Sequence, residues 1–171
     1  LGTGLTGGTT GIRVLSMTTL DSDLIAAGLF TTAGGLPANR IARWNGSTWS
    51  ALGSGMNSTI MALAVLPNGD LVAAGGFSTA GGTAANGIAR WNGSTWSPLA
   101  SGIISGQVLS MVRMPNGDLV VGGNFQFPDN NIARWDGVAW SSLGGGIGQP
   151  GIAGNLVRAL AVLPNGDLIA G

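Results

Sequence analysis

Short apolar runs alternate with glycine-rich turns along the chain. Residues 60–66 are apolar, 67–69 read Pro-Asn-Gly, and 70–77 form a second run rich in Val and Ala. After a polar loop, residues 87–91 and 95–99 flank an Asn-Gly dipeptide, which accepts the positive φ of a tight hairpin turn. No stretch keeps the 3.6-residue apolar period of a helix. The pattern therefore predicts an all-β fold built from four-stranded antiparallel units.

This unit is repeated along the chain. One phrase recurs almost unchanged: IARWNGSTWS at 41–50 and 88–97, and IARWDGVAWS at 132–141. A second phrase runs in step with it: LDSDLIAAGLF at 20–30, LPNGDLVAAGGF at 66–77, MPNGDLVVGGNF at 114–125 and LPNGDLIAG at 163–171. Four strands in about 45 residues are typical of a β-propeller blade. We therefore expect a β-propeller segment of about three and a half blades.

Aligning the units places the blade boundaries within one propeller segment, 1–171. The expected parts are the end of a preceding blade with its connector at 1–12, blade 1 at 13–58, blade 2 at 59–106, blade 3 at 107–155 and half of blade 4 at 156–171. An incomplete ring exposes blade faces that ordinarily pack on neighbours. We therefore expect further blades of the parent chain, or other copies of this chain, as partners.

Two features resemble known propeller repeats. The doublets Gly75-Gly76 and Gly122-Gly123, each followed by a Trp, resemble kelch-type blades, although unit 1 has Gly28-Leu29 and the chain has no Tyr. The combination of PNGDLVAAGG with IARWNGSTW is similar to repeats of predicted secreted bacterial propeller proteins. The resemblance implies kelch-like geometry and an extracellular or cell-surface location.

Composition excludes several function classes. The sequence is 44% hydrophobic and 8% charged, which predicts a folded chain. Seven Arg and seven Asp give zero net charge, so we expect no nucleic-acid partner. No apolar run approaches the ~20 residues of a membrane span. Without His, Cys, Lys, Glu or Tyr, we expect no enzyme, cofactor or metal site.

Paired Trp residues flank the last hairpin of each complete unit. Their two interpretations are packing between blades and stacking platforms for sugar rings, and we favour packing because every blade shares them. The residues are Trp44 and Trp49, Trp91 and Trp96, and Trp135 and Trp140.

Acidic and basic residues also recur about once per unit. One-to-one recurrence favours a structural ion pair over a ring of charges lining a central channel. The residues are Asp23, Asp70, Asp118 and Asp167, with Arg43, Arg90 and Arg134.

Residues that break the repeat are the weak binding candidates. Arg113 and Arg158 stand where unit 2 has Val65 and Met61. Phe127 and Asp129 occupy a shortened loop in unit 3.

Three glycosylation-type triplets begin at Asn45, Asn57 and Asn92. For the two Asn-Gly triplets we favour a hairpin turn over glycosylation.

Together these features favour a non-catalytic scaffold or interaction module of a larger secreted or surface bacterial protein. Its interblade loops would bind a protein or a glycan. Two alternatives remain. One is a structural protein that closes its open blade faces by self-assembly. The other is a fragment of a carbohydrate-active enzyme with a catalytic Asp pair, although no spacing selects such a pair.

Overall fold

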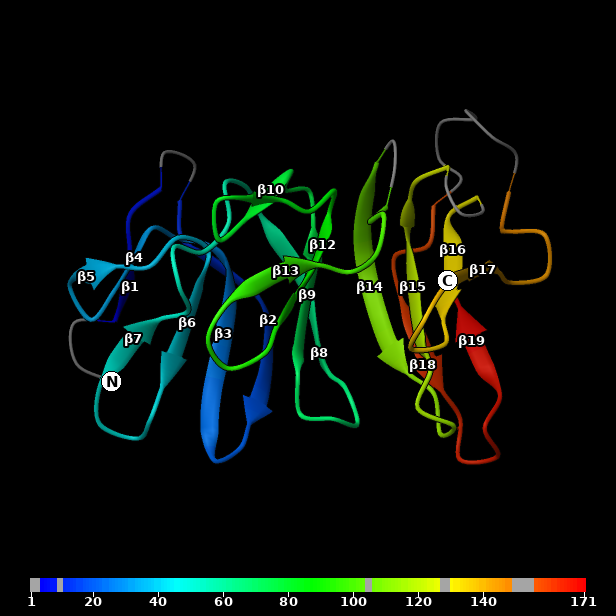
Figure 1. Ribbon diagram of the computed structural model, residues 1–171, viewed down its shortest axis with the longest axis horizontal. Helices are drawn as coiled ribbons and strands as arrows, with labels where there is room; N and C mark the ends of the chain where they lie inside the picture. The colour runs from blue at the N-terminus through cyan, green and yellow to red at the C-terminus, as the bar shows by residue number, and fades with distance from the viewer. Residues whose placement is uncertain (1–3, 9–10, 104–105, 127–129, 149–155) are drawn as a thin grey trace.

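The computed structural model describes residues 4–8, 11–103, 106–126, 130–148 and 156–171, and every regular element in them is a strand. Three four-stranded antiparallel sheets follow one another in chain order (Figure 1). In each sheet the chain runs through the strands consecutively from one edge to the other, as in a propeller blade. The predicted all-β architecture of four-stranded blades is confirmed.

The strand bounds repeat from blade to blade. Blade 1 contains β2 (Arg13–Leu20), β3 (Asp23–Leu29), β6 (Ile41–Trp44) and β7 (Trp49–Ala51). Blade 2 contains β8 (Ile60–Val65), β9 (Leu71–Gly75), β12 (Ile88–Trp91) and β13 (Trp96–Pro98). Blade 3 contains β14 (Gln107–Arg113), β15 (Leu119–Asn124), β16 (Ile132–Trp135) and β17 (Trp140–Ser142). A further hairpin contains β18 (Leu160–Val162) and β19 (Leu168–Ala170).

Blades 1 and 2 each have additional short strands between their second and third long strands, and an earlier short strand pairs with those of blade 1. They are β1 (Leu5–Thr6), β4 (Thr32–Ala33) and β5 (Leu36–Pro37) in one small sheet, and β10 (Thr79–Ala80) and β11 (Thr83–Ala84) in another. The Gly34 N–H donates to the Gly4 carbonyl oxygen at 2.8 Å, and the Gly81 N–H donates to the Gly55 carbonyl oxygen at the same distance. The segment around Gly4 therefore contacts the loop of blade 1 in the same way as the segment around Gly55 contacts the loop of blade 2.

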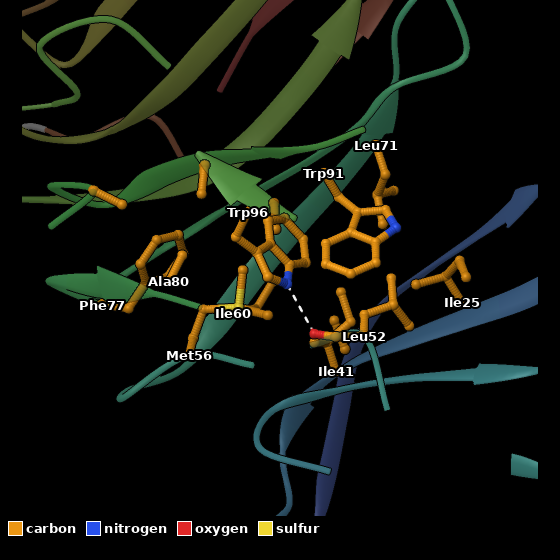
Figure 2. Close-up of a cluster of buried hydrophobic side chains, with 14 of the residues drawn as sticks. Ile25, Ile41, Leu52, Met56, Ile60, Leu71, Phe77, Ala80, Trp91 and Trp96 are labelled. Atoms are coloured by element: carbon orange, nitrogen blue, oxygen red, sulfur yellow. Dashed lines mark hydrogen bonds between the residues drawn. The ribbon is translucent and has the colours of Figure 1, made fainter. Parts of the chain in front are cut away.

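The hydrophobic core lies between the blades. Because strand side chains alternate between two faces, Leu71 and Ala73 of β9 join a cluster shared with blade 1, whereas Val72 and Ala74 join one shared with blade 3. All five residues of β9 are buried. The first strands β2, β8, β14 and β18 contact their neighbours in succession. Figure 2 shows the cluster between blades 1 and 2.

A β-bulge near the start of the first strand in blades 1, 2 and 3 explains one glycine in each of these blades. The register shifts between Val14 and Ser16, between Ile60 and Ala62, and between Val108 and Ser110. The glycine opposite the residue that precedes each bulge has no room for a side chain. A Cβ there would lie 2.1 Å from the Arg13 carbonyl oxygen at Gly28, 2.2 Å from that of Thr59 at Gly75, and 2.1 Å from that of Gln107 at Gly123.

The two glycine doublets are therefore not one motif, which corrects the sequence interpretation. The glycine facing the bulge is the first of Gly75-Gly76 but the second of Gly122-Gly123. Gly122 takes the place of Ala74, since each pairs with the first residue of the third strand. Unit 1 lacks a doublet and still meets the requirement with Gly28.

Candidate functional site

The Trp pairs face each other across the last hairpin of each blade. Trp91 lies opposite Trp96 in register, their ring centroids are 5.3 Å apart, and the other two pairs lie at 5.4 Å. Trp96 is buried in the cluster shared with blade 1, and its Nε1 donates to the Leu52 carbonyl oxygen of that blade at 2.8 Å (Figure 2). Four Trp residues are buried and two, Trp44 and Trp140, are half-buried. The rings thus pack within and between blades.

Each complete blade carries an ion pair between the start of its second strand and its third strand. Asp23 pairs with Arg43, and Asp118 pairs with Arg134. In blade 2 the Arg90 Nε lies 3.4 Å from the Asp70 Oδ2. The Asp side chains are largely buried and the Arg side chains are about two-fifths exposed (39–42%). Such pairs position the turn more than they stabilise the fold.

The Asp of each Pro-Asn-Gly-Asp turn is also held by the Asn two residues before it. Asn68, Asn116 and Asn165 each donate from Nδ2 to Oδ2 of the following Asp, at 2.8, 2.6 and 2.8 Å. Asp167 is held in this way by Asn165 and has no counterpart of Arg43 among the ion pairs of the described residues. In unit 1 the place of this Asn is taken by Asp21, which adopts a positive φ of 55°.

These turns line two grooves between blades. Between blades 2 and 3 a groove of about 270 Å³ is lined by Asn68, Arg90, Asp118, Trp135 and Asp136, among others. The corresponding groove between blade 3 and the β18–β19 hairpin has about 590 Å³. Hydrogen bonds from the N–H groups of Ala139 and Val138 hold the pKa of Asp136 below its ordinary value.

Crevices of a different kind lie at the opposite ends of the strands. One of about 350 Å³ between blades 1 and 2 is lined by Asn39, Arg40, Ser54, Asn57 and Thr79, among others. Another of about 360 Å³ between blades 2 and 3 is lined mainly by small and apolar residues, with Ser78 and Asn86. The first crevice differs from the second in carrying a charged side chain.

Arg40 is the residue that sequence reasoning missed. Its φ is 69°, and the same place is taken by Gly87 with a φ of 77° and by Asn131 with a φ of 64°. Gly and Asn are the residues that accept this left-handed conformation readily, whereas Arg does not. Lining up ANR at 38–40 with ANG at 85–87 and DNN at 129–131 would have exposed the exception.

The structure does not bring the repeat-breaking candidates together. Arg113 ends β14 at the turn end of blade 3 and is exposed. Arg158 is also exposed, and its N–H donates to the Gly171 carbonyl oxygen at 2.7 Å, next to the far end of β19. They therefore lie at opposite ends of different first strands. Phe127 and Asp129 lie outside the described residues.

The Asn side chains of the two Asn-Gly glycosylation-type triplets are engaged in turns. The Asn45 Oδ1 accepts hydrogen bonds from the N–H groups of Ser47 and Thr48 at 3.0 and 2.8 Å. Asn92 makes the same bonds at 3.0 and 2.9 Å. These contacts are those of a hairpin turn.

Two features are absent from the described part of the chain. It contains no group of three or more His, Cys, Asp or Glu residues placed to hold a metal ion. None of its elements is a helix with the length and apolar character needed to cross a bilayer.

Comparison with known proteins agrees with the repeat and the blades. No curated protein matches the sequence significantly. Residues 2–149 match the family model described as the Rax2 C-terminal beta propeller domain. Because this match spans most of the 171 residues and the structure consists of four-stranded blades, the chain belongs to that β-propeller family.

Proposed function

We propose that this chain is a non-catalytic interaction scaffold within a larger secreted or cell-surface bacterial protein, and that its ligand is a protein. A β-propeller domain in general is such a module, with rigid blades that present loops to a partner.

The use of the Trp residues is the observation that favours a protein over a glycan. Sugar recognition by stacking requires an aromatic face open to solvent. Here each Trp packs against its pair partner, and Trp96 and Trp140 also donate from Nε1 to a carbonyl oxygen of the preceding blade. The crevice between blades 1 and 2 is the surface that fits this argument, because none of the described aromatic residues lines it, whereas Trp135 lines the groove between blades 2 and 3.

Catalysis has little support from the residues that line these surfaces. The titratable groups that line the described grooves are Asp and Arg. Asp118 pairs with Arg134 and Arg90 with Asp70, while Asp136 accepts hydrogen bonds from backbone N–H groups. A glycosidase acid or base must contact its substrate, whereas the carboxylates of Asp70 and Asp118 contact a guanidinium instead. The glycosidase alternative is therefore disfavoured.

The test compares ligand classes on the same protein. A phage-displayed random peptide library and a glycan array would be probed with the purified chain, and a panel of chromogenic glycosides would be incubated with it. We expect selected peptides and neither array binding nor hydrolysis. Saturable glycan binding without peptide selection would overturn the proposal, and turnover of a glycoside would restore the enzyme alternative.

Self-assembly remains as a second candidate because of one observation. Met17 on β2 is 63% exposed and Ile169 on β19 is 51% exposed, at the two ends of the row of blades. Exposed apolar strand faces favour association with another blade. Light scattering over a concentration series tests this: a mass that rises with concentration supports assembly, and a constant monomer mass contradicts it.

A further inference from the structure

Two polar residues that occur in unit 1 and not in units 2 and 3 meet in one crevice. Arg40 and Asn57 both line the crevice between blades 1 and 2. In the sequence, the place of Asn57 is taken by Ile104 in unit 2 and by Gly148 in unit 3. The blade packing that all units share requires neither residue.

Arg40 occupies its position against its backbone preference. At a φ of 69° the Cβ of a non-glycine residue crowds the backbone. Unit 2 avoids this with Gly87, and unit 3 has Asn131, a residue type that accepts the conformation more readily than Arg. Residues kept in such a conformation cluster at functional sites. The strain therefore points to a role for the Arg40 side chain itself.

The Arg40 guanidinium has N–H groups that make no hydrogen bond within the described part of the chain. Its Nη1 donates to the Phe30 carbonyl oxygen at 3.4 Å, a long bond. In the part of the chain that the structure describes, no carboxylate forms an ion pair with it, unlike Arg43 and Arg134. A half-buried guanidinium with free N–H groups is suited to an incoming carboxylate, which it can bind in a bidentate geometry.

The walls of the crevice are held in place before any ligand arrives. The Asn57 Oδ1 accepts hydrogen bonds from the N–H groups of Ser78 and Thr79, both at 3.0 Å, and its Nδ2 donates to the Ser78 Oγ at 2.8 Å. On the other wall, the Asn39 Nδ2 donates to the Ser54 carbonyl oxygen at 3.1 Å. These bonds fix both walls of a space of about 350 Å³, which is at the small end for ligand sites.

We propose that this crevice binds an acidic side chain of a protein partner, with Arg40 as the group that pairs with its carboxylate. The inference rests on the proposed protein-scaffold function and names the chemistry of one contact. No aromatic residue lines this crevice, so a peptide carboxylate is favoured over an acidic sugar.

The experiment follows backbone amide signals by NMR during titration with a blocked Gly-Gly-Glu-Gly-Gly peptide. Its Gln counterpart and glucuronate serve as parallel probes. We expect the Glu peptide to shift the signals of Arg40, Asn57 and Thr79, and to bind about tenfold or more tightly than the Gln peptide. Glucuronate should bind more weakly than the Glu peptide.

Two variants make the result specific. Arg40→Gly copies unit 2, where Gly87 takes the same backbone conformation, so it should fold with an unchanged or higher melting temperature while losing the binding. Arg113→Gln removes one positive charge from the exposed end of β14 in blade 3 and should bind the Glu peptide as the natural chain does.

Three results with the small probes would overturn the proposal. The first is an absence of shifts at the crevice with the Glu peptide, and the second is an equal loss of binding in Arg113→Gln, which would indicate a general charge effect. The third is tighter binding of glucuronate, which would indicate an acidic sugar. If library-selected peptides bind Arg40→Gly as well as the natural chain, the scaffold function stands and this site fails.

Discussion

The Nε1 of Trp96 in β13 donates a 2.8 Å hydrogen bond to the carbonyl oxygen of Leu52, which follows the last strand of the preceding blade (Figure 2). Both groups are buried. The bond therefore satisfies a carbonyl that water cannot reach, and it ties the outer edge of blade 2 to blade 1.

Replacing Trp96 with Phe should destabilise the chain by about 2–4 kcal/mol, because it leaves the Leu52 carbonyl unsatisfied and removes part of a buried ring. Urea unfolding followed by Trp fluorescence would measure this. Trp140→Phe is the matched control: its Nε1 bond to the Leu99 carbonyl oxygen is 3.3 Å long and half-buried, so its loss should be smaller. Equal losses in the two variants would contradict the argument.

The bulge glycine predicts a sharp contrast between two adjacent residues. In Gly75→Ala the new Cβ would lie 2.2 Å from the Thr59 carbonyl oxygen, so the bulge must open, and we expect a loss above about 3 kcal/mol. In Gly76→Ala the nearest atoms are 3.2 Å away in the flexible Gln107 side chain, and we expect a loss below about 1 kcal/mol. Thermal melts of both variants would reveal the difference, and a tolerant Gly75 would disprove the bulge requirement.

A serine after the bulge joins neighbouring first strands. The Ser16 Oγ accepts a bond from the Leu63 N–H at 3.1 Å, and the Ser110 Oγ accepts one from the Leu160 N–H at 3.0 Å. Blade 2 has Ala62 in this place. Ala62→Ser should create the missing bond to the Met111 N–H and stabilise the chain by about 0.5–1 kcal/mol.

The reverse change provides the control for this prediction. Ser16→Ala should destabilise the chain by about 1 kcal/mol, measured by the same urea unfolding. Slower hydrogen exchange of the Met111 amide in Ala62→Ser would locate the gain. A variant that is less stable than the natural chain would show that the hydroxyl does not fit at this boundary.

Asp136 gives the chain one acid-sensitive turn. Hydrogen bonds from the N–H groups of Ala139 and Val138 lower its pKa in the folded chain. Because the folded pKa lies below the unfolded one, the contribution to stability is present above the unfolded pKa and is lost as pH falls through the folded pKa. Asp136→Asn should lose this dependence while keeping the turn, since Asn45 and Asn92 make the same contacts in units 1 and 2.

An NMR titration of the Asp136 carboxyl group provides the direct measurement. Its midpoint should fall below the ordinary Asp value of about 3.9. Between about pH 7 and about pH 3, the urea midpoint of the natural chain should fall further than that of Asp136→Asn. A midpoint at or above the ordinary value would contradict the role of these hydrogen bonds.

The sequence predicted the fold well because the repeat carries the information more than once. The turn chemistry of Asn-Gly and the alternation of apolar residues each indicate the same hairpins, and the recurring Asp and Arg mark the ends of the same strands. The structure then places Asp118 against Arg134 and Trp91 against Trp96 at short range. A pattern repeated at fixed spacing is sufficient to place such contacts.

The sequence was less informative where backbone conformation decides. The glycine doublets looked alike in letters, yet the bulge makes Gly75 equivalent to Gly123 and leaves Gly76 and Gly122 in different environments. Arg40 was missed for the same reason, because a left-handed φ is invisible until the residue is compared with Gly87 and Asn131. Substitution of a glycine by a bulky residue within a repeat was the available signal.

Ala62 also has a mechanical consequence. The boundary between blades 1 and 2 has the serine bond of Ser16 and the short indole bond of Trp96, whereas the boundary between blades 2 and 3 has an alanine and a longer indole bond at 3.3 Å. Apolar contacts resist separation over a short distance and slide easily, while hydrogen bonds fix register. If the chain is pulled along its row of blades, the boundary between blades 2 and 3 should open before the boundary between blades 1 and 2.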